Sequence, residues 1–68
     1  MNEIIATIIE SLPNTIYKVK DINTGKEYLC YIAGKMRMHK ISIMLGDKVR
    51  VKLDPYGGKA TNRIIRRL

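Results

Sequence analysis

The sequence has no tryptophan, no phenylalanine and only one cysteine among its 68 residues. A single cysteine, Cys30, excludes a disulfide framework and a cysteine-rich zinc site. His39 has no second histidine and no cysteine pair beside it, so we expect no metal. The sequence also lacks a phosphate-binding glycine loop, a Ser–His–acid set and a close pair of carboxylates. We therefore predict a protein that is not an enzyme and needs no cofactor.

Long hydrophobic runs are missing as well. The apolar stretch near the N-terminus is interrupted by Thr7 and Glu10, and it is shorter than the roughly 20 residues that span a membrane. Residues 1–3 lack the positive charge of a signal peptide. A chain of this length can hold one modest core. We predict one soluble domain over residues 1–68 that stays in the reducing compartment where it is made.

Acidic residues are scarce, and the cations gather in one half of the chain. Residues 1–34 hold three lysines against four carboxylates, a net charge of −1. Residues 35–68 hold ten cations against two aspartates, a net charge of +8, and they include all five arginines. The guanidinium group matches phosphate with its planar fork of donors. This asymmetry predicts a nucleic-acid partner for the second half; the alternative is a solvated, solubilising surface.

Strand patterns recur along the chain between turn signals such as Pro13-Asn14, Gly25 and Gly46. We predict strands over residues 4–12, 16–22, 26–32, 48–53 and 63–67. Residues 34–44 have little β-branching, and we predict a loop or one helical turn there. Five strands with one short helical turn between the third and the fourth predict an all-β, five-stranded oligonucleotide-binding (OB-fold) barrel. The alternative is a five-stranded barrel of the SH3 type.

The alternation of side chains within these strands predicts which residues face the core. Tyr17 shares a face with Val19, and we expect it in the core. Cys30 has the parity of a small apolar core residue. Tyr31 falls on the outer face, where an aromatic ring can stack on a nucleobase. The alternative for Tyr31 is packing against a neighbouring loop.

Residues 34–40 form the sharpest candidate site, because this segment is cationic and contains two flexible methionines. Such a loop can place lysine and arginine on phosphates and a thioether against a base. The alternative is an ordinary surface connection. Arginines also flank Ile64-Ile65 in the last predicted strand, where they either contact phosphate or line a solvated edge. The candidate RNA-binding residues are Tyr31, Lys35, Met36, Arg37, His39, Lys40, Lys59, Arg63 and Arg66.

Five short blocks resemble bacterial translation initiation factor one in identity, order and spacing, and the resemblance covers about residues 6–66. The blocks are Leu12-Pro13-Asn14-Thr15, Gly34-Lys35-Met36-Arg37, Gly46-Asp47-Lys48-Val49, Pro55-Tyr56 and Arg63-Ile64. The resemblance implies an OB-fold barrel related to the RNA-binding modules of ribosomal protein S-one. It further implies a monomer of the bacterial cytoplasm, or of the plastid stroma if the protein is plastid-encoded.

The family resemblance also implies a binding place and partners. It implies binding to rRNA at the aminoacyl-tRNA site (A-site) of the small ribosomal subunit, occlusion of that site, and support of the other two initiation factors. The decoding-site RNA helix and a neighbouring ribosomal protein would be its contacts there. By position, Lys35, Met36 and Arg37 would belong to the loop that enters the RNA groove. Arg63 and Arg66 would match the basic residues at the family's C-terminal end.

The sequence departs from the family pattern at three places. Tyr31-Ile32-Ala33 stands where the family has His-Ile-Ser, which keeps a stacking surface but removes a titratable group. Lys40-Ile41-Ser42 stands where the family has an aromatic residue followed by Ile-Arg, and Lys40 replaces part of the charge. The loop that ends at Arg63 is one residue longer and places Asn62 in the loop.

Two other functions are consistent with a small basic barrel. A general single-strand nucleic-acid binder of the cold-shock type would carry clustered aromatic residues, including phenylalanine. This sequence has no phenylalanine. A protein-interaction barrel whose charge serves only solubility would have no affinity for RNA. Binding experiments with small subunits and with free single-stranded RNA distinguish the three.

Overall fold

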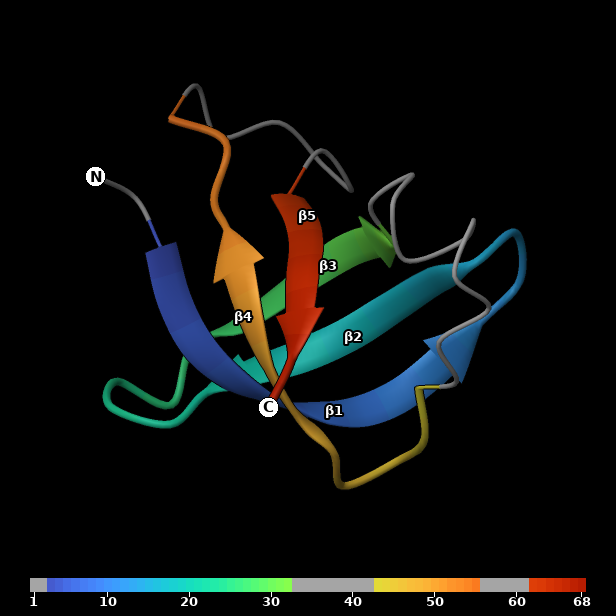
Figure 1. Cartoon of the computed structure of the whole chain (residues 1–68), viewed down its shortest axis with the longest axis horizontal. Helices are drawn as coiled ribbons and strands as arrows, with labels where there is room; N and C mark the ends of the chain where they lie inside the picture. The colour runs from blue at the N-terminus through green and yellow to red at the C-terminus, as the bar shows by residue number, and fades with distance from the viewer. Residues whose placement is uncertain (1–2, 33–42, 56–61) are drawn as a thin grey trace.

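The computed structural model describes residues 3–32, 43–55 and 62–68, and this part of the chain forms strands and no helix (Figure 1). The strands are β1 (Glu3–Leu12), β2 (Ile16–Asp21), β3 (Glu27–Ile32), β4 (Lys48–Lys52) and β5 (Asn62–Arg67). They close into a barrel in the order β1-β2-β3-β5-β4. All neighbours pair antiparallel except β3 and β5, which pair parallel. The predicted five-stranded OB-fold barrel is therefore confirmed, whereas the predicted helical turn lies mostly outside the described residues.

The longest strand, β1, closes the barrel because it pairs with β4, the last strand in the order, as well as with β2. Ala6 lies opposite Asp21 of β2 on one side and opposite Val49 of β4 on the other. A bulge between Ile8 and Glu10 shifts the register with β2. Bulges bend the strand that carries them and increase its twist. In Figure 1 the strand curves along the barrel from the β4 side to the far end of β2.

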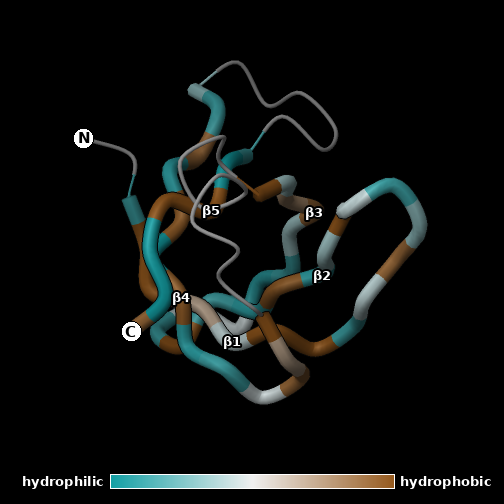
Figure 2. Tube along the Cα trace, turned by 45° about the vertical axis from the view of Figure 1, so that its right-hand side comes forward, coloured by the Kyte–Doolittle hydropathy of each residue, from teal (hydrophilic) through white to brown (hydrophobic). Residues whose placement is uncertain are grey.

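The barrel interior is filled by aliphatic side chains, as the period-two pattern predicts. The fully or nearly fully buried core residues are Ala6, Ile8, Val19, Cys30, Ile32, Val49, Val51 and Ile64. Tyr17 is half-buried and packs against this cluster, which agrees with its predicted inward parity. Figure 2 shows the strands as a ring around this interior, with apolar and polar positions interspersed along each strand. Burial raises the pKa of the Cys30 thiol to about 12, so the core cysteine stays neutral.

Strand β2 ends one residue earlier than predicted because Asp21 starts the next turn. Its buried carboxylate accepts hydrogen bonds from the N–H groups of Asn23, at 2.8 Å, and Thr24, at 3.4 Å. Gly25 completes the turn with a φ of 77°, a conformation that glycine adopts without a Cβ clash.

Within the described ranges, no helix is long and apolar enough to cross a membrane.

The turn between β1 and β2 holds two non-glycine residues with positive φ, Asn14 at 64° and Thr15 at 60°. The N–H of Ile16 donates to the carbonyl of Pro13 across this turn, at 3.4 Å. Two positive φ angles in the central positions are typical of a type I′ hairpin turn. Asparagine tolerates this region, whereas a β-branched residue such as Thr15 is strained there.

We expect Thr15→Gly to stabilise the protein by about 0.5–1 kcal/mol. The substitution removes a left-handed strain of roughly 1–2 kcal/mol, partly offset by the greater entropy of glycine in the unfolded chain. Thr24→Gly is the control, because Thr24 itself does not have a positive φ. This variant relieves no strain and loses the hydrogen bond that the Lys26 N–H donates to the Thr24 hydroxyl, so it should be less stable than wild type. Urea unfolding of both variants measures the difference, and a Thr15→Gly variant less stable than wild type would contradict the interpretation.

Candidate nucleic-acid interface

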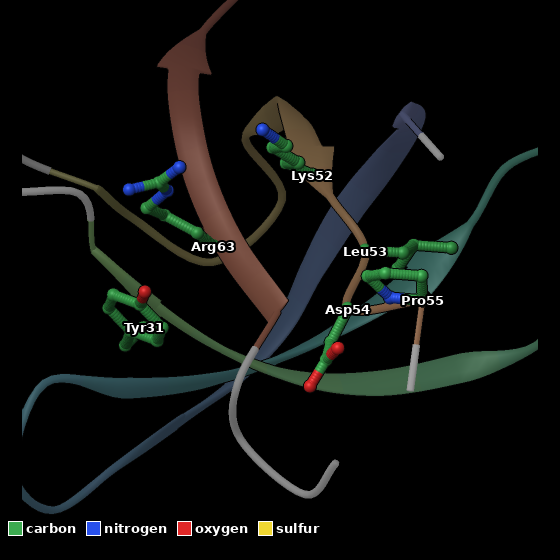
Figure 3. A pocket seen from close by; sticks show the side chains of 6 residues that line it. All are labelled: Tyr31, Lys52, Leu53, Asp54, Pro55 and Arg63. Atoms are coloured by element: carbon green, nitrogen blue, oxygen red, sulfur yellow. The ribbon is translucent and has the colours of Figure 1, made fainter. Parts of the chain in front are cut away.

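One row of paired residues crosses the outer face of three neighbouring strands. Tyr31 on β3 lies opposite Arg63 on β5, and Arg63 lies opposite Lys52 on β4. Directly paired residues point to the same face of a sheet, so the aromatic ring and the two cations share the outer surface. Figure 3 shows their side chains extending to the same side of the three strands. Tyr31 is half-buried, and Arg63 and Lys52 are exposed.

This row forms one wall of an open hollow of about 240 Å³. The chain that follows β4 supplies the remaining walls, and the lining residues are Tyr31, Lys52, Leu53, Asp54, Pro55 and Arg63 (Figure 3). Single-stranded nucleic acids are commonly bound by an aromatic ring beside a positively charged groove. The hollow offers such a combination at the end of β3 and the start of β5.

Asn62, which the sequence predicts in the preceding loop, connects Asp54 of the hollow with β3. It is instead the first residue of β5 and is buried. Its side-chain oxygen accepts a hydrogen bond from the N–H of Asp54, at 2.8 Å, and its side-chain amide donates to the carbonyl of Leu29, at 3.1 Å. One side chain thereby joins β3, β5 and the segment after β4. No sequence motif marks it, because its role depends on Leu29, 33 residues away in the chain, as well as on Asp54.

Arg66 lies on the outer face because β5 contains a bulge. Arg50 of β4 is opposite Arg66, but the next residue, Val51, is opposite Ile64, so Ile65 is the extra residue. Simple alternation would place Arg66 on the same face as the buried Ile64. Bulges re-aim side chains in this way. Arg66 therefore shares the outer face with Arg63, in a different row from Tyr31.

Ion pairs involve Lys18 of the first half of the chain and Arg50 of the second half. Lys18 lies between Glu10 and Glu27, with Nζ–O distances of 3.8 and 3.7 Å. Arg50 is paired with Glu3, at 3.7 Å. Within the described residues, neither Arg63 nor Arg66 takes part in an ion pair. The two arginines are thus available for an anionic partner.

Six of the nine predicted site residues lie outside the described residues, and the structure does not test them. They are Lys35, Met36, Arg37, His39, Lys40 and Lys59. Of the other three, the structure brings Tyr31 and Arg63 together and places Arg66 farther along β5. The sequence interpretation missed Lys52, whose outward parity was already visible in the alternation of β4. Among residues 3–32, 43–55 and 62–68, no group of three or more potential metal-ligating residues is present.

Comparison with known proteins gives a match over the whole chain. The family model described as "Translation initiation factor 1A / IF-1" matches residues 1–68. The fold is similar to the solution structure of translation initiation factor one from the Wolbachia endosymbiont strain TRS of Brugia malayi, with a TM-score of 0.77 and 37% identity. That match covers 97% of this chain and 76% of the other.

The fold is also similar to part of a larger protein, YjeQ from Thermotoga maritima, whose crystal structure matches with a TM-score of 0.78 and 26% identity. The match covers 97% of this chain but only 22% of that protein. The likeness to YjeQ therefore concerns one barrel of a longer chain.

Proposed function

Because the chain belongs to the translation initiation factor 1A / IF-1 family, we propose that it binds rRNA at the A-site of the small ribosomal subunit. The chain is a translation initiation factor and not an enzyme. In the proposed function it occludes the A-site, supports the other two initiation factors and contacts a neighbouring ribosomal protein. It acts where the ribosomes are, in the bacterial cytoplasm or the plastid stroma.

The observation that carries this proposal is the pairing of Tyr31 with Arg63 in an open hollow whose other lining residues come from the basic half of the chain. A half-buried ring is fixed by its neighbours and still presents a face to a base. Arg63 and Arg66 add charge-assisted contacts to phosphate. Lys35, Met36, Arg37, His39, Lys40 and Lys59 are proposed to supply further RNA contacts on the ground of the family resemblance.

Cosedimentation with purified small subunits tests the proposal. We expect the protein to sediment with the subunits and to be displaced by a ligand that occupies the A-site. Free single-stranded RNA is run in parallel, because a general single-strand binder would bind it as tightly as it binds the subunit. Binding that an A-site ligand leaves unchanged would contradict the proposed site.

Two substitutions of Tyr31 test the stacking contact. If its ring stacks on an RNA base, Tyr31→Phe keeps the π-face and should bind small subunits as wild type does. Tyr31→Ala should weaken binding by about 1–3 kcal/mol, the usual range for a base–aromatic stack. Small-subunit affinity and melting temperature are measured for both variants.

The two measurements separate stacking from the other roles of Tyr31. If the ring only packs against the protein, the alanine variant melts at a lower temperature and its affinity per folded molecule is unchanged. If the hydroxyl makes the important contact, the phenylalanine variant binds as weakly as the alanine variant. Tyr17→Phe is a suitable control, because Tyr17 packs against the core and lies outside the hollow.

A further inference from the structure

The outer face of β4 and β5 carries five cations in two facing columns. Along β4, Val49 and Val51 are buried, so the residues between and beside them point outward. On β5, Arg63 points outward, and the bulge at Ile65 brings Arg66 to the same face. We call this set the β4–β5 cation face; its members are Lys48, Arg50, Lys52, Arg63 and Arg66.

Like charges lie directly opposite each other on this face. Lys52 is paired in register with Arg63, and Arg50 with Arg66. Such cross-strand pairs destabilise a sheet, because the facing side chains are close neighbours. The one carboxylate that pairs with the set in the described ranges is Glu3, which lies in register with Lys52 and forms an ion pair with Arg50. The face therefore keeps an excess of positive charge at a cost to the stability of the barrel.

The shape of the face restricts which anion it fits. From Lys48 to Lys52 a strand rises by about 13 Å, and neighbouring strands lie about 5 Å apart. The cations therefore form a narrow stripe instead of one focus of charge. A single small anion would touch only one or two of them, whereas a polymer with regularly repeated negative charges can follow the stripe. The hollow beside Tyr31 shares Lys52 and Arg63 with this face. Because its aromatic ring can stack on a base, the polymer that fits both surfaces is RNA.

We propose that the β4–β5 cation face binds the sugar–phosphate backbone of RNA, with Lys48 and Lys52 as phosphate ligands beside Arg63 and Arg66. The inference rests on the proposed function in taking RNA as the partner, and it extends the RNA-binding surface from the hollow to the whole outer side of β4. Stacking at Tyr31 and phosphate contacts along β4 would then bind the same RNA strand or two adjacent RNA strands.

The test compares two double variants with the same loss of charge. Lys48→Gln with Lys52→Gln removes two cations from the face, and Lys20→Gln with Lys26→Gln removes two exposed lysines from the other half of the chain. The probes are purified small subunits, an oligouridylate as single-stranded RNA and an RNA hairpin as duplex. Each dissociation constant is measured over a range of salt concentrations at constant magnesium.

We expect the β4 double variant to lower the log–log salt slope by about 1.4 on a single strand or about 1.8 on a duplex, and to weaken binding tens-fold near 0.1 M salt. Whichever free RNA shows this change identifies the strandedness of the partner. The Lys20 and Lys26 control should leave the slope nearly unchanged. The β4 variant should melt within a few degrees of wild type, because it relieves the like-charge pair of Lys52 and Arg63 but also removes the Lys52 charge opposite Glu3.

Two results would overturn the proposal. If both double variants weaken binding equally, the charges act only through the net field of the protein. If wild type binds small subunits and the β4 variant binds them equally well, the face is not an RNA contact, although the proposed function stands. A wild-type protein that binds no small subunit would instead refute the proposed function itself.

Discussion

Raising the salt concentration from about 50 to about 200 mM is expected to weaken binding to small ribosomal subunits by about three orders of magnitude. The reason is that each phosphate neutralised by the protein releases condensed counterion, and the second half of the chain holds ten cations. Six of them in contact with phosphates are enough for an effect of this size. The measurement is a titration of labelled protein with subunits in monovalent salt at constant magnesium.

The same titration needs a control for the integrity of the protein and the subunit. Circular dichroism at both salt concentrations establishes that the barrel stays folded, and sucrose-gradient sedimentation establishes that the subunits stay intact. A dissociation constant that hardly changes with salt would show that the basic half does not form the interface. The charge asymmetry of the sequence would then serve only solubility.

Asn62→Ala is expected to destabilise the barrel by about 2–5 kcal/mol, because the partly buried N–H of Asp54 and carbonyl of Leu29 both lose this partner. In a domain of this size, a loss of 1 kcal/mol lowers the melting temperature by about 4–8 °C. We therefore expect a decrease of at least about 10 °C in calorimetry. Asn23→Ala, at an exposed turn position, should change stability by less than about 0.5 kcal/mol.

A second variant separates the hydrogen bonds of Asn62 from its volume. Asn62→Asp has the same shape, but in its ionised form it cannot donate to Leu29 and it buries a charge. Desolvation raises the pKa of such a carboxyl in the folded state, so the variant is most stable in acid and loses stability as the pH rises above about 4. Equal melting temperatures for Asn62→Ala and Asn23→Ala would contradict the role assigned to Asn62.

Local sequence patterns were sufficient to predict the strands and the inward or outward direction of most side chains. The alternation in Lys48–Lys52 and the turn signal at Gly25 act over a few residues, so they are visible without knowledge of the fold. The outward position of Tyr31 followed from the same parity. Its pairing with Arg63 is a parallel contact between strands 32 residues apart, and no local pattern fixes that register.

The features that the sequence did not reveal all depend on contacts between distant segments. The bulge at Ile65 exists only in relation to the register of β4, and it decides on which face Arg66 lies. Asn62 resembles an ordinary loop residue until β3 and the segment after β4 are brought beside it. The alternation in residues 48–52 is enough to place Lys52 outward, but its place in the hollow depends on the neighbouring strands.

The pairing of β1 with β4 also has a consequence for the order in which the barrel folds. The hairpins β1–β2 and β2–β3 join neighbouring segments, whereas β1 reaches β4 only when Glu3 meets Lys52. The entropy cost of closing a loop rises with its length, and folds dominated by distant pairings fold in milliseconds to seconds. We expect barrel closure to be the slow step of folding. Until it occurs, residues 3–7 of β1 have an unpaired edge through which partly folded chains can aggregate.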